Sequence, residues 1–141
     1  MNRHLSLGVA EADAATAACL FELDRRGKAA VIVVTDHHGE LIQLLRMDGA
    51  MLPSIVIAAN KAYTAARVGK PSGDVGRAAL DENADVHYHG DARYVGWDGG
   101  VPILVDQTCV GAVAISGLSG AEDLEIAQIG ADAIARHLAS T

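Results

Sequence analysis

The chain has 141 residues, of which 50% are hydrophobic and 21% are charged. This balance excludes an intrinsically disordered chain, and the length is sufficient for one domain with its own core. The formal charge of −7 argues against a nucleic-acid-binding protein, whose contact face is basic. The sequence contains no apolar run of about 18 residues that could cross a membrane.

The cysteines and the N-terminal segment indicate the cellular compartment. Cys19 and Cys109 form neither a Cys-x-x-Cys motif nor a zinc-type spacing, so we expect two buried thiols rather than a disulfide scaffold. The N-terminal segment becomes acidic at Glu11 and Asp13 before any apolar signal core develops, which predicts that no secretory peptide is present. We therefore expect a cytoplasmic protein.

The first part of the chain predicts a helix followed by two paired strands. Residues 7–26 are expected to be helical, with an apolar stripe at helical spacing formed by Leu7, Ala10, Ala14, Ala17 and Phe21. Residues 29–34 are a short apolar run, typical of a strand that is covered on both faces. A turn of about four residues separates this run from a second strand at 41–47, which predicts an antiparallel hairpin.

The rest of the chain predicts more helices around a second hairpin. The expected elements are a helix at 53–68, a short helix at 74–83, an irregular segment at 84–100, strands at 101–105 and 109–115, and a last helix. Ser119 and Glu122 form a capping-box pattern at the start of that last helix. The turn at Asp106 and Gln107 joins the two strands directly, so we expect them to pair antiparallel.

This order of elements predicts an α+β fold. We expect a single domain spanning residues 1–141, with a mostly antiparallel sheet of about five strands covered by helices in a profilin-like, three-layer arrangement. No strand is followed by a G-x-G-x-x-G or P-loop motif, so no cradle for nucleotide phosphates is predicted.

Three charged residues are candidates for ligand binding. Arg46 and Asp48 lie where the second strand meets the second helix, and an arginine can hold a carboxylate through two parallel hydrogen bonds. The alternative is an Arg46–Asp48 ion pair that organises the turn. Lys61 borders the apolar stripe of an alanine-rich helix, where it either points at a ligand or reaches the solvent.

Two histidines and two aromatic residues lie close together in the irregular segment. In an extended segment, His87 and His89 would face the same side, so they can address one metal or one ligand, and histidine can also transfer protons near neutral pH. Tyr94 and Trp97 can form the walls for a flat apolar ligand. The alternative is a pair of exposed loop histidines with no ligand.

Gly99 and Gly100 come immediately before the third strand. Paired glycines permit close backbone approach or a positive φ, either beside a ligand or in a tight turn. Together, these candidates predict a pocket between the 84–100 segment and the segment from Arg46 to Lys61.

Several ordered segments carry a resemblance to a known family. They are Val34-Thr35-Asp36 with Gly39-Glu40-Leu41, Arg46-Met47-Asp48-Gly49-Ala50, Lys61-Ala62-Tyr63-Thr64-Ala65, Gly99-Gly100-Val101-Pro102-Ile103, Val110-Gly111-Ala112-Val113 with Ser116-Gly117, and Glu122-Asp123. In this order they resemble the GlcG-like and HbpS-like proteins and the C-terminal module of PduO-type cobalamin adenosyltransferases.

The resemblance implies a profilin-like sheet, assembly into dimers, tetramers or octamers, and a pocket for a small ligand. In some members this pocket takes haem or another tetrapyrrole. The resemblance also implies that five residues line or support the pocket: Arg46, Asp48, Lys61, Gly99 and Gly100.

Three functional hypotheses follow. The leading one is a homo-oligomeric haem or tetrapyrrole binder, with the propionates near Arg46 or Lys61 and His87 or His89 as the axial ligand. The alternative is a cofactor-free hydrolase, tautomerase or lyase that acts on a small carboxylated or hydroxylated metabolite. In that enzyme Arg46 and Lys61 hold an anionic group, and His87 or His89 is catalytic as the proton carrier. The third hypothesis is an interaction module without a small ligand.

Overall fold

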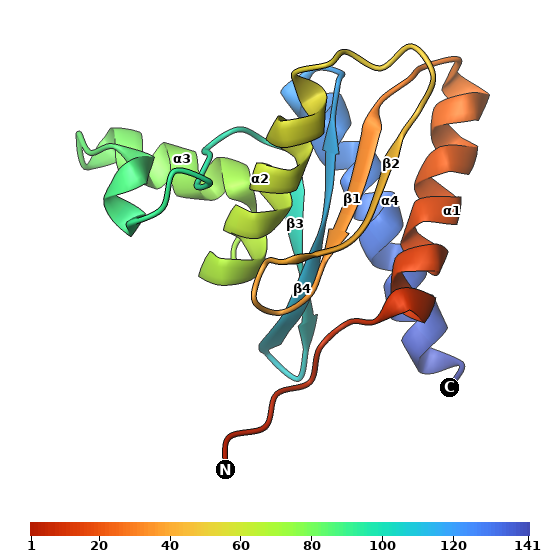
Figure 1. The fold of residues 1–141 in the computed structure, drawn as a ribbon, viewed down its shortest axis with the longest axis horizontal. Helices are drawn as coiled ribbons and strands as arrows, with labels where there is room; N and C mark the ends of the chain where they lie inside the picture. Colours follow the sequence, from red (N-terminus) through yellow and green to blue (C-terminus); the bar gives the residue numbers. More distant parts are fainter.

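A four-stranded antiparallel sheet lies between two layers of helices (Figure 1). The computed structural model describes residues 1–141 and places the strands in the order β2-β1-β4-β3. The strands are β1 (Val31–Thr35), β2 (Leu41–Arg46), β3 (Gly100–Val105) and β4 (Thr108–Ser116). The predicted α+β, three-layer architecture is confirmed.

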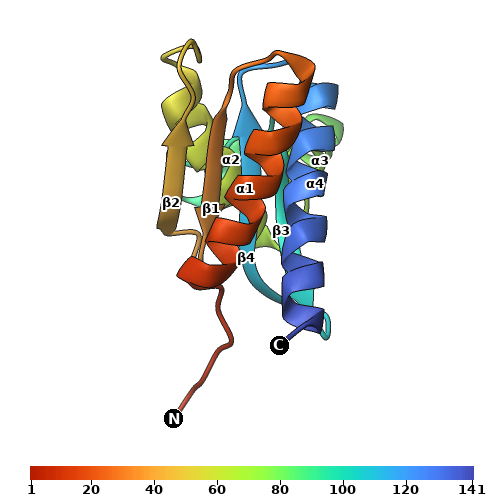
Figure 2. The same cartoon turned by 90° about the vertical axis from the view of Figure 1, so that its right-hand side faces the viewer.

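Two helices cover one face of the sheet and one helix covers the other. α1 (Val9–Arg26) and α4 (Gly120–Ala139) pack side by side on one face of the sheet (Figure 2), and α2 (Ser54–Val68) packs on the other. α3 (Ser72–Asp81) and the short 3-10 helix η1 (Val86–His89) extend from α2 away from the sheet (Figure 1). No helix combines the length and the apolarity that a bilayer crossing requires.

The prediction of about five strands is wrong, because the sheet has four. Both hairpins form where the apolar runs indicated them. No segment is left for a fifth strand, since the irregular segment before β3 forms η1 and turns. Asp85 begins η1, where its carboxylate accepts a hydrogen bond from the backbone N–H of His87 at 2.8 Å, and Gly90 ends it with φ +96°. A capped turn of this kind competes with an extended strand.

The sheet separates two hydrophobic cores of different character. Seventeen buried residues fill the space on the side of α1 and α4, whereas eight fill the α2 side. Ile32 and Val34 of β1 belong to the larger core, and Val31 and Val33 belong to the smaller one. β1 is therefore covered on both faces, as its unbroken apolar run predicts.

The predicted apolar stripe of α1 is rotated from the real one. The buried residues of the helix are Ala12, Ala15, Cys19 and Leu23, whereas Phe21 is 72% exposed. Alanine is small and frequent in this helix, so more than one face satisfies helical spacing, and the position of Leu23 decides which face is buried.

The two thiols differ in burial. Cys19 is completely buried, and this burial raises its pKa to about 12. Cys109 is only half-buried, so the expectation of two buried thiols holds for Cys19 alone. Burial also raises the pKa of Cys109, and a thiol that stays protonated is a poor nucleophile.

An ion pair lies inside the protein between α2 and α4. The ammonium group of Lys61 donates to the carboxylate of Asp123 at 2.9 Å and to the carbonyl oxygen of Ile115 at 3.0 Å. The side chains of Lys61 and Asp123 are only 1% and 4% exposed. The second carboxylate oxygen of Asp123 accepts from the backbone N–H of Leu118 at 3.0 Å. The pair therefore connects α2, the end of β4 and the first turn of α4.

The paired glycines permit the backbone to approach this ion pair closely. A Cβ at Gly99, whose φ is +127°, would lie 2.6 Å from the carbonyl oxygen of Ile115 and 2.8 Å from Nζ of Lys61. A Cβ at Gly100 would lie 2.4 Å from the carbonyl oxygen of Lys61. The strand β3 can therefore begin beside Lys61 only when neither residue has a side chain.

Substitution of Gly99 tests this close approach. We expect Gly27→Ala, at φ +66° with nothing within 4 Å, to lower the free energy of unfolding only through backbone strain, by about 1–2 kcal/mol. Gly99→Ala should cost about 1–3 kcal/mol more, because its Cβ must displace neighbouring atoms. Urea unfolding of both variants measures the difference, and equal losses would contradict the steric argument.

Removal of one partner of the ion pair tests its structural role. We expect Lys61→Met to lower the free energy of unfolding by about 3–5 kcal/mol, because it leaves Asp123 buried without a counter-charge. The double variant Lys61→Met/Asp123→Leu should be more stable than the single one, since no buried charge remains. A Lys61→Met protein as stable as the wild type in urea would show that the pair is not structural.

Candidate functional site

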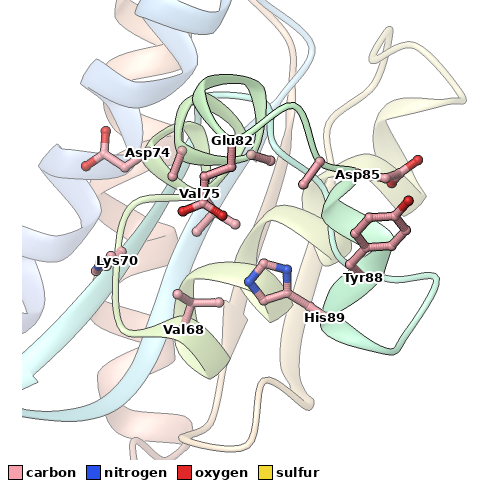
Figure 3. Close-up of a pocket in the computed structure, with 11 residues that line it drawn as sticks. Val68, Lys70, Asp74, Val75, Glu82, Asp85, Tyr88 and His89 are labelled. Atoms are coloured by element: carbon pink, nitrogen blue, oxygen red, sulfur yellow. The ribbon is translucent and has the colours of Figure 1, made fainter.

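A cavity of about 710 Å³ lies between the C-terminal end of α2, α3 and η1 (Figure 3). Its wall is largely apolar and includes Val68, Val75, Ala78, Ala79 and Ala84. The volume is within the range of small-molecule sites, which are typically about 300–1,000 Å³ and mostly apolar with a few polar groups. The cavity therefore has the size and lining of a ligand pocket.

His89 is the polar group with the clearest orientation in this cavity. Figure 3 shows its ring extending towards the space between Val68 and Val75. Nδ1 lies 3.0 Å from the carbonyl oxygen of Val86. A carbonyl oxygen can only accept, so the neutral ring carries its proton on Nδ1 and a lone pair on Nε2. This tautomer, fixed by a backbone carbonyl, is typical of histidines that bind metals.

The two histidines of the segment do not act as an adjacent pair. The segment is a 3-10 helix with about three residues per turn rather than an extended chain, so positions 87 and 89 do not share a side. His89 lines the cavity. His87 does not, and its Nδ1 lies 3.3 Å from the carboxylate of Asp85. The expectation that both imidazoles face one ligand fails for this reason.

Tyr94 lies behind His89 rather than in the cavity wall. The ring centroids of Tyr94 and His89 are 5.0 Å apart, and those of Tyr94 and Tyr63 are 5.2 Å apart in an edge-to-face arrangement. Tyr63 is a buried residue of α2, only 2% exposed. The three rings therefore form a continuous contact from α2 to η1.

Arginine contacts hold the same segment against its neighbours. The guanidinium of Arg93 lies 4.0 Å from the centroid of the Tyr63 ring, which is cation–π geometry. Arg93 also pairs with Glu40 at 3.0 Å and with Asp91 at 3.2 Å. These contacts fasten residues 91–95 to α2 and to the turn between β1 and β2.

Trp97 lies on the other side of α3. It is 68% exposed and lines a second hollow of about 590 Å³, together with Arg77 and Asp98. Arg77 is paired there with Asp98 at 3.1 Å. Tyr94 and Trp97 therefore do not form two walls of one pocket within the chain.

Arg46 and Asp48 lie at the end of β2, away from the cavity of His89. Both are exposed and line a shallow hollow of about 390 Å³. Neither side chain makes a hydrogen bond or an ion pair, so the alternative of an Arg46–Asp48 pair is wrong. Lys61, Gly99 and Gly100 line no cavity and gather around Asp123 instead.

The predicted site residues thus fall into separate groups in the structure. No cavity is lined both by residues of the 84–100 segment and by Arg46. The lining residues of α3 and the cation Lys70 were missed, because the apolar residues of a ten-residue helix do not indicate whether they face a pocket or the core. The partnership of Asp123 with Lys61 was also missed, although a lysine among buried alanines requires a counter-charge. No group of three or more His, Cys, Asp or Glu side chains can hold a bare metal ion.

The family model described as haem degrading protein HbpS-like matches residues 7–132. The chain belongs to the HbpS-like family. This confirms the resemblance to the GlcG-like and HbpS-like proteins.

Individual proteins are similar to this HbpS-like protein over most of its length. An uncharacterised 15.0 kDa protein in the dhaT–dhaS intergenic region of Citrobacter freundii is 30% identical over 105 residues, covering 72% of this chain and 73% of that protein. The crystal structure of Klebsiella pneumoniae protein ORFY has a TM-score of 0.88 at 24% identity, covering 96% and 94% of the two chains. A crystal structure of a PduOC–haem complex has a TM-score of 0.82 at 25% identity, covering 92% of this chain and 95% of that chain.

The contacts of Arg93 predict how the segment responds to acid. Hydrogen bonds from the Arg93 guanidinium and backbone N–H lower the pKa of Asp91 from its ordinary value of 3.8 to about 2. Because the folded-state pKa is the lower one, the contribution of Asp91 to stability is complete above pH 3.8 and is lost as the pH falls towards 2. We expect a carbon-13 NMR titration of the Asp91 carboxyl to show a midpoint near 2.

The matched variant is Arg93→Met, which removes the guanidinium and keeps the backbone donor. It should move the Asp91 midpoint upwards, back towards 3.8. An unchanged midpoint in this variant, or a wild-type midpoint near 3.8, would contradict the assigned cause.

Proposed function

We propose that this HbpS-like protein binds haem or a related tetrapyrrole in the cavity between α2, α3 and η1, with His89 as the axial ligand. The observation that carries the proposal is the His89 ring, which lies at an apolar cavity with Nδ1 facing the Val86 carbonyl and a lone pair on Nε2. Neutral imidazole nitrogen is a common axial ligand of haem iron.

The lining of the cavity supports this choice of ligand. A porphyrin is flat and apolar, and the valines and alanines of α2 and α3 supply an apolar wall for it. Lys70 is the one cation among the lining residues, whereas Asp74, Glu82 and Asp85 are acidic. The propionates of a bound haem would therefore be directed towards Lys70. In this proposal Lys70 replaces Arg46 and Lys61, which lie elsewhere.

The chain's own residues orient and shield the ligand. Val86 holds the proton on Nδ1 of His89, and the apolar wall would cover one side of a bound ligand. A bound haem would supply a redox-active iron at this position. The competing hypothesis of a cofactor-free enzyme needs Arg46 and Lys61 beside a histidine, an arrangement that the single chain does not assemble.

We further propose that the protein is homo-oligomeric and cytoplasmic. Exposed apolar side chains support self-association, because Met51, Leu52 and Val56 near the start of α2 are each at least 60% exposed. The native mass of the purified protein, measured by light scattering, tests this part. A monomer at micromolar concentration would contradict it.

Titration with hemin tests the ligand and the axial residue. We expect a saturable Soret band at one hemin per binding site. His89→Ala should lose the spectrum of the histidine-ligated form and weaken binding by at least about 10-fold. His87→Ala is the matched neighbour and should titrate like the wild type, because His87 does not line the cavity.

The outcomes separate the parts of the proposal. No spectral change with stoichiometric hemin would overturn haem binding. A loss of binding in His87→Ala but not in His89→Ala would overturn the choice of axial ligand.

A further inference from the structure

We infer that Tyr94 is a positioning residue, whose ring holds the His89 imidazole in its ligand-binding orientation. The inference rests on the proposed function for what His89 binds. The sequence suggests that Tyr94 forms a wall of the cavity. The inference assigns it a different role, behind the ligating histidine.

His89 lies on an element that cannot fix a side chain by packing of its own. η1 has four residues, and none of them is buried. A surface histidine on such a short helix can exchange between rotamers. A ligating imidazole, in contrast, must be held within a narrow range of orientations by neighbouring groups.

Two contacts restrict the His89 ring. The Val86 carbonyl, 3.0 Å from Nδ1, fixes one edge of the ring but leaves its plane free to tilt about that hydrogen bond. The Tyr94 ring supplies the second contact, with a centroid separation of 5.0 Å and an interplanar angle of 41°. Together the two contacts determine both the direction and the plane of the imidazole.

Tyr94 can transmit this restraint because it is anchored to a rigid helix. Its ring packs edge-to-face on Tyr63, a 2% exposed residue of α2. The next residue, Val95, donates its backbone N–H to Oγ1 of Thr64 in α2 at 2.9 Å. The position of the imidazole is therefore set from α2 rather than by η1.

The aromatic ring of Tyr94, not its hydroxyl, makes these contacts. The hydroxyl has no hydrogen-bond partner in the structure, whereas the ring contacts both Tyr63 and His89. Tyr94→Phe should therefore preserve the positioning. Tyr94→Leu retains apolar bulk but has no ring face, and Tyr94→Ala removes both.

The first experiment examines the ligand-free protein. Nitrogen-15 NMR of the His89 imidazole should show a predominantly Nδ1-protonated ring at neutral to alkaline pH in the wild type and in Tyr94→Phe. Tyr94→Ala and Tyr94→Leu should show a mixture of the two tautomers, because the ring no longer stays against Val86. Unfolding in urea checks that each variant is folded. If Tyr94→Ala is not folded, Tyr94→Leu alone is compared with the wild type.

The second experiment adds hemin to the same variants. Tyr94→Ala and Tyr94→Leu should bind about 10–100-fold more weakly and shift the Soret band towards a less completely ligated form. Tyr94→Phe should resemble the wild type. Phe21→Ala is the matched control, because it removes a 72% exposed aromatic ring from α1, away from the cavity.

The two experiments fail in different ways. Wild-type tautomers in the folded Tyr94→Leu variant would overturn the positioning role, and so would wild-type hemin binding in that variant. If the wild-type protein itself binds no hemin, the proposed function fails, and the NMR comparison still decides whether Tyr94 holds His89.

Discussion

A buried charge pair determines how closely the layers of this protein approach one another. Lys61 has almost no contact with solvent, so its ammonium group depends on Asp123 and on the Ile115 carbonyl oxygen for compensation. The pair fixes α2 against the start of α4 across one edge of the sheet. Because the ion pair and the backbone carbonyl groups of Ile115 and Lys61 fill this region, the backbone of β3 must enter it without side chains at Gly99 and Gly100.

The same contact region continues to the wall of the cavity. The backbone N–H of Gly100 donates to Oγ of Ser72 at 2.9 Å, and this hydroxyl donates to the carbonyl oxygen of Trp97 at 2.6 Å. Ser72 is the first residue of α3, the helix that supplies one wall of the cavity. The ion pair, the paired glycines and the position of α3 are therefore linked through a single buried hydroxyl.

The fold could be predicted where a local pattern determines the structure. The valine-rich run of β1 and the turn at Asp106 and Gln107 indicated both hairpins, and Ser119 caps α4 as its pattern suggests. The site could not be predicted to the same extent, since its contacts join residues far apart in sequence. Lys61 and Asp123 are 62 positions apart, and no spacing rule connects them.

Competing local interactions explain the remaining differences between the predictions and the structure. The face of α1 was ambiguous because alanines satisfy helical spacing on several sides, and the buried face is the one that carries Leu23. The geometry of His87 and His89 depended on whether their segment was extended. The segment is a 3-10 turn capped by the carboxylate of Asp85. An argument from the two-residue spacing of His87 and His89 does not take such a cap into account.

Three of the segments that carry the family resemblance lie around the ion pair rather than around the cavity. Lys61, the paired glycines and Asp123 all belong to such segments and build the contact between layers. The residues 84–98, which include His89 and Tyr94, contribute none of them. These segments therefore identify the scaffold, while the proposed ligand site depends on a segment outside them. That segment places the His89 imidazole at the cavity, with the centroid of the Tyr94 ring 5.0 Å from that of the imidazole.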